Sequence, residues 1–76
     1  MGTTYSAGEQ AFIDQNTRRL LTVWCHQTIA TGGAPPMIAT EYQVYAAHAV
    51  TKGWLSSKDG RVLASGWTTA AAFLKR

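Results

Sequence analysis

The sequence predicts a small α+β domain whose elements follow in the order helix, helix, β-hairpin, helix. Two stretches, residues 6–30 and 40–52, carry apolar side chains at the three- and four-residue spacing of amphipathic helices. Over residues 53–67, two Gly-Trp pairs enclose short apolar segments and a Lys-Asp-Gly-Arg turn, which is typical of a hairpin. A last apolar face, from Trp67 to Leu74, predicts the final helix.

Length and composition indicate one folded domain over residues 1–76, with residues 1–5 expected to be flexible. The hydrophobic fraction of 46% with only 14% charged residues excludes the composition of a disordered chain. Cys25 is the one cysteine, so the fold does not depend on a disulfide, and a cytoplasmic location is expected. No apolar run is long enough to cross a membrane, and the first ten residues do not have the pattern of a signal peptide.

The first helix is predicted from its start signal, its apolar stripe and its stop signal. Ser6 and Glu9 have the spacing of a capping box, in which each side chain bonds the other residue's backbone N–H. Gly32 and Gly33, followed by two prolines, are expected to end the helix. Its core-facing stripe comprises Ile13, Thr17, Leu20, Leu21, Trp24 and Thr28.

The second helix is expected to begin with another capping box, formed by Thr40 and Gln43, and to end at Lys52 before Gly53. One face is apolar and consists of Tyr42, Tyr45, Ala46 and Ala49. The opposite face is short-chained and polar, with no acidic group, and consists of Gln43, Ala47, His48 and Thr51.

The hairpin is predicted to pair residues 54–57 with 61–64 around a turn in which Gly60 has the left-handed conformation. Gly66 is expected to break the second strand, and Ser65 to cap the last helix. Trp54 and Trp67 each follow a glycine at an element boundary and lie in phase with an apolar stripe, so both are expected in the core.

Residues 40–76 resemble the second half of a winged-helix DNA-binding domain. The resemblance lies in a helix that ends in Gly53-Trp54-Leu55, a hairpin with a basic tip, and a C-terminal helix. The first half departs from that family, because residues 34–39 are too short for the helix that supports the recognition helix. Either the segment 6–30 forms two helices, with a break near Asn16, or the support helix is absent.

The resemblance implies double-stranded DNA as the partner and a transcriptional regulator as the function. It implies that the outer face of the second helix contacts bases in a groove of the DNA and that the hairpin tip forms the wing. Other basic residues would contact phosphates at the periphery. The excess positive charge agrees, because residues 39–76 carry five Lys or Arg and two Asp or Glu, a net +3. The implied DNA contacts are Gln43, Ala47, His48, Thr51, Lys52, Lys58, Arg61, Lys75 and Arg76.

No catalytic, metal-binding or cofactor-binding pattern is present, so an enzyme is not expected. Cys25 and His26 are neighbours on a helix and point about 100° apart, which does not make a thiolate–imidazole pair. Together with His48 they provide too few ligands for a structural zinc site. No glycine-rich phosphate loop occurs in the chain.

The alternative function is a protein–protein interaction or assembly module, either an adaptor or a homodimer through the first helix. A domain of this size is not expected to cover all of its apolar side chains, and uncovered apolar surface indicates a partner. The residues expected to remain uncovered are Phe12, Val23, Ile29, Met37, Ile38 and Val44.

Overall fold

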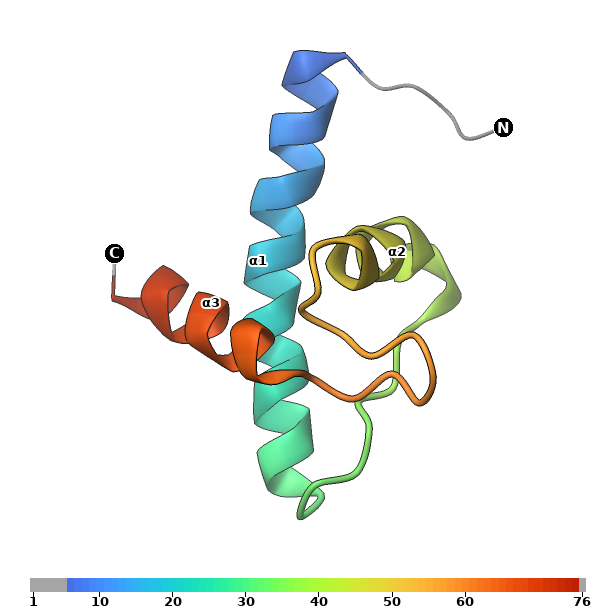
Figure 1. Ribbon diagram of the computed structural model, residues 1–76, viewed down its shortest axis with the longest axis vertical. Coiled ribbons are helices and arrows are strands. Elements are labelled where there is room, and N and C mark those ends of the chain that lie inside the picture. The colour runs from blue at the N-terminus through green and yellow to red at the C-terminus, as the bar shows by residue number, and fades with distance from the viewer. Residues whose placement is uncertain (1–5, 76) are drawn as a thin grey trace.

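One long helix supports two short helices in this chain, as the computed structural model shows (Figure 1). The structure describes residues 6–75; the expected flexibility of residues 1–5 and the predicted DNA contact of Arg76 lie outside them. Helices α2 and α3 both pack on α1, and they extend to opposite sides of it (Figure 1). The elements are α1 (Ala7–Ala30), the 3₁₀-helix η1 (Thr40–Tyr42), α2 (Gln43–Thr51) and α3 (Ala64–Leu74).

The predicted α+β class is wrong, because the described residues contain 67% helix and no strand. The expected hairpin is reduced to one antiparallel bridge between Leu55 and Val62. The Leu63 N–H still donates to the Trp54 carbonyl at 2.9 Å, but the Leu63 carbonyl already accepts the first bond of α3, from the Trp67 N–H at 3.0 Å. Ala64, expected to end the second strand, therefore begins α3, and no wing forms. The predicted capping role of Ser65 is also wrong, because Ser65 lies inside α3 and the N-cap is Leu63, which makes no side-chain cap bond.

Helix α1 is continuous, which settles the question of one helix or two over residues 6–30. Its predicted capping box is confirmed: the Ser6 Oγ accepts from the Glu9 N–H at 3.2 Å, and the Ser6 N–H donates to Glu9 Oε1 at 3.1 Å. The predicted stop is also confirmed, since Gly32 and Gly33 have φ of 74° and 109°, values that favour glycine. Because α1 is unbroken and α2 is the next α-helix, the described chain has no support helix of the winged-helix kind.

Helix α2 begins later than the sequence predicts. The expected capping box of Thr40 and Gln43 does not form, because residues 40–42 make a 3₁₀ turn in which the Tyr42 N–H bonds the Ala39 carbonyl at 2.9 Å. The predicted end is confirmed: Gly53 has φ of 79°, and the Trp54 N–H donates back to the Ala49 carbonyl at 2.8 Å. The chain therefore turns sharply from α2 toward α1.

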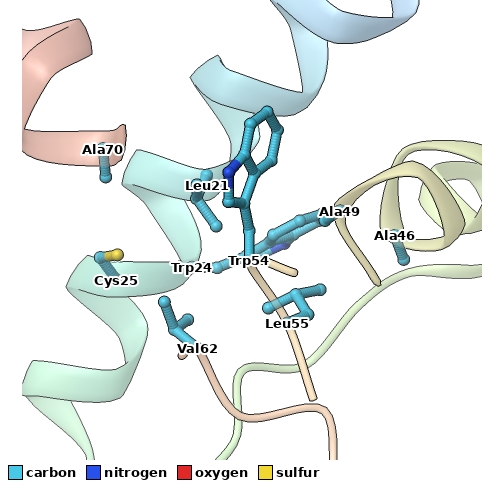
Figure 2. Packing of buried hydrophobic residues seen from close by; sticks show 9 residues of the cluster. All are labelled: Leu21, Trp24, Cys25, Ala46, Ala49, Trp54, Leu55, Val62 and Ala70. Carbon is cyan, nitrogen blue, oxygen red and sulfur yellow. The ribbon is translucent and has the colours of Figure 1, made fainter. Parts of the chain in front are cut away.

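The core lies where α1 meets α2 and the segment that follows it (Figure 2). Trp24 on α1 and Trp54 are only 2% and 6% exposed, so the predicted core position of Trp54 is confirmed. Trp67, also expected in the core, is 36% exposed. Helix α3 instead turns the small residues Gly66 and Ala70 inward, and the next side chain along a helix points about 100° away.

Gly66 permits the close approach of α3 to the chain after α2. A Cβ at this position would lie 2.4 Å from the Trp54 carbonyl oxygen and 2.8 Å from a Val62 methyl carbon. Because the first contact is to backbone, the site cannot relax by a rotamer change alone. Gly66 was expected to break a strand, but its role is to let the helix pack.

We expect Gly66→Ala to reduce the free energy of unfolding by about 1–3 kcal/mol, the usual cost of overpacking a tight site. The matched control is Gly8→Ala on α1, where a Cβ meets nothing within 4 Å and where alanine favours the helix. Urea denaturation of both variants measures the difference. Equal stabilities would contradict the close packing of α3 on Trp54.

Candidate functional site

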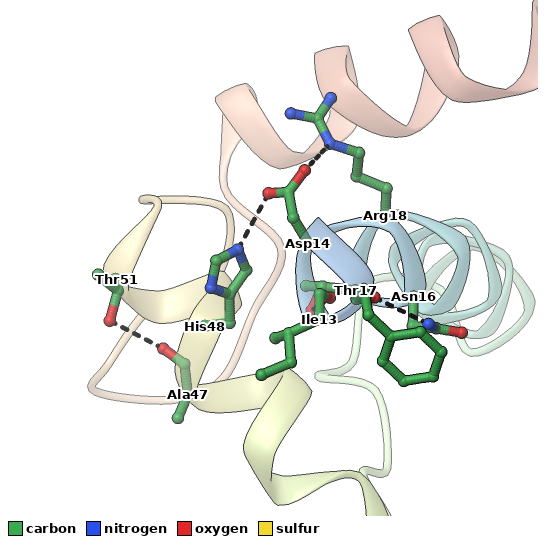
Figure 3. A network of polar contacts seen from close by, with 9 residues as sticks. Ile13, Asp14, Asn16, Thr17, Arg18, Ala47, His48 and Thr51 are labelled. Carbon is green, nitrogen blue, oxygen red and sulfur yellow. Dashed lines mark hydrogen bonds and ion pairs between the residues drawn. The ribbon is translucent and has the colours of Figure 1, made fainter. Parts of the chain in front are cut away.

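The outer face of α2 presents three of its four predicted DNA-reading residues to solvent. Gln43, Ala47 and Thr51 are exposed, and the Thr51 hydroxyl donates to the Ala47 carbonyl at 3.0 Å (Figure 3). His48 differs, because its ring turns from this face toward α1. The four residues therefore do not form one continuous reading surface.

His48 belongs to a polar cluster that joins α1, α2 and the segment after α2. The Asp14 carboxylate binds His48 Nε2 through Oδ1 at 3.0 Å and Arg18 Nε through Oδ2 at 2.7 Å (Figure 3). The Arg18 guanidinium lies 5.2 Å from the Trp54 ring centroid, and the His48 ring meets Trp54 edge-on at 6.0 Å. The predicted pairing of Arg18 with Asp14 is confirmed.

This polar cluster links α1 to α2 through the Asp14 carboxylate. Partial burial by itself would raise the pKa of Asp14, but the hydrogen bonds from His48 and Arg18 and their positive charge outweigh it and lower that pKa below its ordinary value. The carboxylate therefore stays ionised and holds two elements together.

The remaining predicted DNA contacts lie apart from one another. Lys58 and Arg61 are exposed in the loop between α2 and α3, where Arg61 Nε lies 3.5 Å from Asp59 Oδ2. Lys75 follows the last turn of α3, on the opposite side of α1 from that loop (Figure 1). Lys52 is exposed at the end of α2.

An apolar groove lies between α1 and α3. It encloses about 140 Å³, and its walls are formed by residues 22–29 of α1 and 67–74 of α3. Ile29 on α1 and Leu74 on α3 are 67% and 61% exposed. The lining residues are Thr22, Cys25, His26, Ile29, Trp67, Ala70, Ala71 and Leu74.

The groove offers a ligand almost no polar contact. The Thr22 hydroxyl already donates to the Arg19 carbonyl at 2.6 Å, so it is satisfied within α1. Cys25 lies in the floor, and burial raises the pKa of its thiol, which therefore stays protonated at neutral pH. The surface can bind apolar groups and provides no reactive nucleophile.

Comparison with known proteins finds no matching family model, no similar curated protein and no similar solved structure. Among residues 6–75, no three His, Cys, Asp or Glu side chains lie together so that they could hold a metal ion. None of the described helices combines the length and apolar character needed to cross a membrane.

The sequence indicated the existence of uncovered apolar side chains but not the groove. Five of the six residues expected to remain uncovered are exposed; Ile38 packs against the core instead. The groove needs Ile29 beside Trp67 and Leu74, which are 38 and 45 residues away in the chain. Only the crossing of α1 and α3 brings them together.

We expect Asp14→Asn to reduce the free energy of unfolding at pH 7 by about 1 kcal/mol, because it weakens the charge-assisted bonds to His48 and Arg18. The pKa of Asp14 is lower in the folded chain than in the unfolded chain. The ionised Asp14 carboxylate therefore contributes its full share of the stability above the unfolded pKa of about 4, and this share is lost as the pH falls through the folded pKa. The gap between wild type and variant should therefore narrow below about pH 4.

Denaturation curves recorded from pH 7 to acid measure that gap. The control is Asp59→Asn, whose ion pair with Arg61 is exposed at both ends and joins no two helices; it should cost less at pH 7. A gap for Asp14→Asn that stays constant down to strong acid would show that its carboxylate does not hold α1 to α2.

Proposed function

We propose that this chain is a non-enzymatic protein-interaction module whose contact surface is the groove between α1 and α3. The observation that carries the proposal is the exposure of Ile29, Trp67 and Leu74 around a shared apolar floor. Contiguous exposed apolar residues on a small soluble domain indicate a surface that a partner covers.

The composition of the groove supports a protein partner. Trp is among the residues that contribute most to binding at protein interfaces, and Trp67 lines the groove from the α3 side. Complete burial of an Ile or Leu side chain contributes about 1.5–3 kcal/mol of favourable free energy. Because Ile29 and Leu74 are each more than half exposed, a partner that buries them would gain more than half of that amount from each.

The size of the groove argues against a small-molecule site. Pockets for drug-sized ligands are about 300–1,000 Å³, whereas this groove encloses about 140 Å³. It has room for an apolar side chain inserted from outside, with the exposed flanks covered by the partner's surface.

DNA binding stays a prediction, and the geometry favours it less. The basic residues predicted to contact DNA are divided between the loop on one side of α1 and Lys75 on the other (Figure 1). His48, a predicted base contact, is bonded to Asp14 instead. The outer face of α2 with Lys52 is still open to solvent, so duplex DNA is the rival outcome of the test. The cytoplasmic location expected from the single cysteine likewise stays a prediction.

Selection from a displayed library of helix-forming peptides tests the proposal. We expect enriched peptides to bind about tenfold or more weakly to Ile29→Ala and Leu74→Ala. Phe12→Ala and Val44→Ala, which remove exposed apolar groups outside the groove, should bind them like wild type. All four sites are exposed, so thermal melting should show intact folds.

Peptides that bind all four variants equally, or the absence of any enriched peptide, would contradict the proposal. Titration of the same variants with mixed-sequence duplex DNA at low salt tests the alternative, DNA binding. Amide shifts confined to Gln43–Thr51 and Lys58–Arg61, with no peptide in the groove, would replace the proposal with nucleic-acid binding.

A further inference from the structure

We infer that the partner seated in the α1–α3 groove is an amphipathic helix with an acidic polar face. This inference rests on the proposed function, because it names the occupant of the same surface. It depends on the charges around the groove and on the shape of its walls.

Two cationic side chains near the groove, Arg19 and Lys75, have no counter-ion among the described residues. Arg19 precedes the lining residue His26 by seven residues, two helical turns, so both lie on one side of α1. Lys75 continues the row of Trp67 and Ala71 along α3 at four-residue spacing. Within residues 6–75 neither Arg19 nor Lys75 forms an ion pair.

The four Asp and Glu side chains of the sequence all lie elsewhere. None lines the groove. Glu9 caps the start of α1, about 20 Å along the helix axis from Thr22 at 1.5 Å per residue. Asp14 is held by Arg18 and His48, while Glu41 in η1 and Asp59 in the loop lie on the α2 side of α1 (Figure 1). Among the side chains of residues 6–75, the groove is thus apolar in its centre, positive at its margin and free of Asp and Glu.

Charge complementarity therefore favours an acidic partner over a second copy of this chain. A symmetric dimer through the groove would bring each surface against itself. Arg19 and Lys75 would then approach the same cations of the other copy, with no Asp or Glu among the lining residues to offset them. Like charges brought together across an interface are a means by which proteins reject a partner.

The walls favour a helix as the form of the partner. Both are helical, and their lining side chains recur at three-, four- and seven-residue spacing: Trp67, Ala70, Ala71 and Leu74 on α3, and Thr22, Cys25, His26 and Ile29 on α1. An amphipathic helix that lays its apolar face between two such walls is a recurrent mode of peptide recognition. Its polar edges would then lie beside Arg19 and Lys75.

Two synthetic helical peptides with the same Leu anchors at i, i+3, i+4 and i+7 test the inference, one with Glu on its polar face and one with Lys. In amide-shift titrations at about 50 mM salt we expect the acidic peptide to bind the groove about tenfold more tightly. The ratio of the two affinities, acidic peptide to basic peptide, should fall at about 500 mM salt, where exposed charges are screened.

The double variant Arg19→Gln with Lys75→Gln should lower the ratio severalfold. The matched control, Lys52→Gln with Lys58→Gln, removes the same charge away from the groove and should leave the ratio unchanged. Equal binding of both peptides in the groove, or tighter binding of the Lys peptide, would overturn the acidic partner and leave the interaction module standing. Binding of neither peptide, with no peptide enriched from the library, would overturn both.

Discussion

The packing of Trp54 is the interaction on which the rest of this structure depends. Its indole is buried against Arg18 of α1 and His48 of α2. Its backbone N–H closes α2 on the Ala49 carbonyl, and its own carbonyl accepts from Leu63 just before α3 begins. One residue therefore joins all three helices, and Gly66 is required because α3 packs directly on that carbonyl.

The groove is a consequence of this arrangement. Helix α1 has 24 residues, whereas α2 and α3 have nine and eleven, so the short helices cannot cover every side of the long one. Helix α3 approaches through Gly66 and Ala70, and its larger residues Trp67 and Leu74 are left beside the contact. Tight packing through small residues and an open apolar margin are thus two results of one helix orientation.

The features that could be predicted from the sequence are those decided by neighbouring residues. The capping box of α1, its end at Gly32, the end of α2 at Gly53 and the left-handed Gly60 each depend on a few adjacent positions. The excess of apolar surface also followed from the short length of the chain and its composition.

The features that could not be predicted depend on distant contacts. A glycine before a tryptophan fits both a strand end and a close helix contact, and only the position of the Trp54 carbonyl decides between them for Gly66. The helical spacing placed His48 on the polar outer face of the second helix, but in the structure it bonds Asp14, which lies 34 residues earlier in the chain. The groove required two helices from opposite ends of the chain, so no local pattern indicated it.

The central claim is that Trp54 is enclosed at the junction of the helices while Trp67 borders an open groove. The most direct measurement is the broadening of the three indole NMR signals by a soluble paramagnetic relaxation agent. We expect strong broadening of Trp67 and little of Trp24 and Trp54, in keeping with exposures of 36%, 2% and 6%. A protected Trp67 would show that the groove is closed, and a broadened Trp54 would show that the three helices do not meet through it.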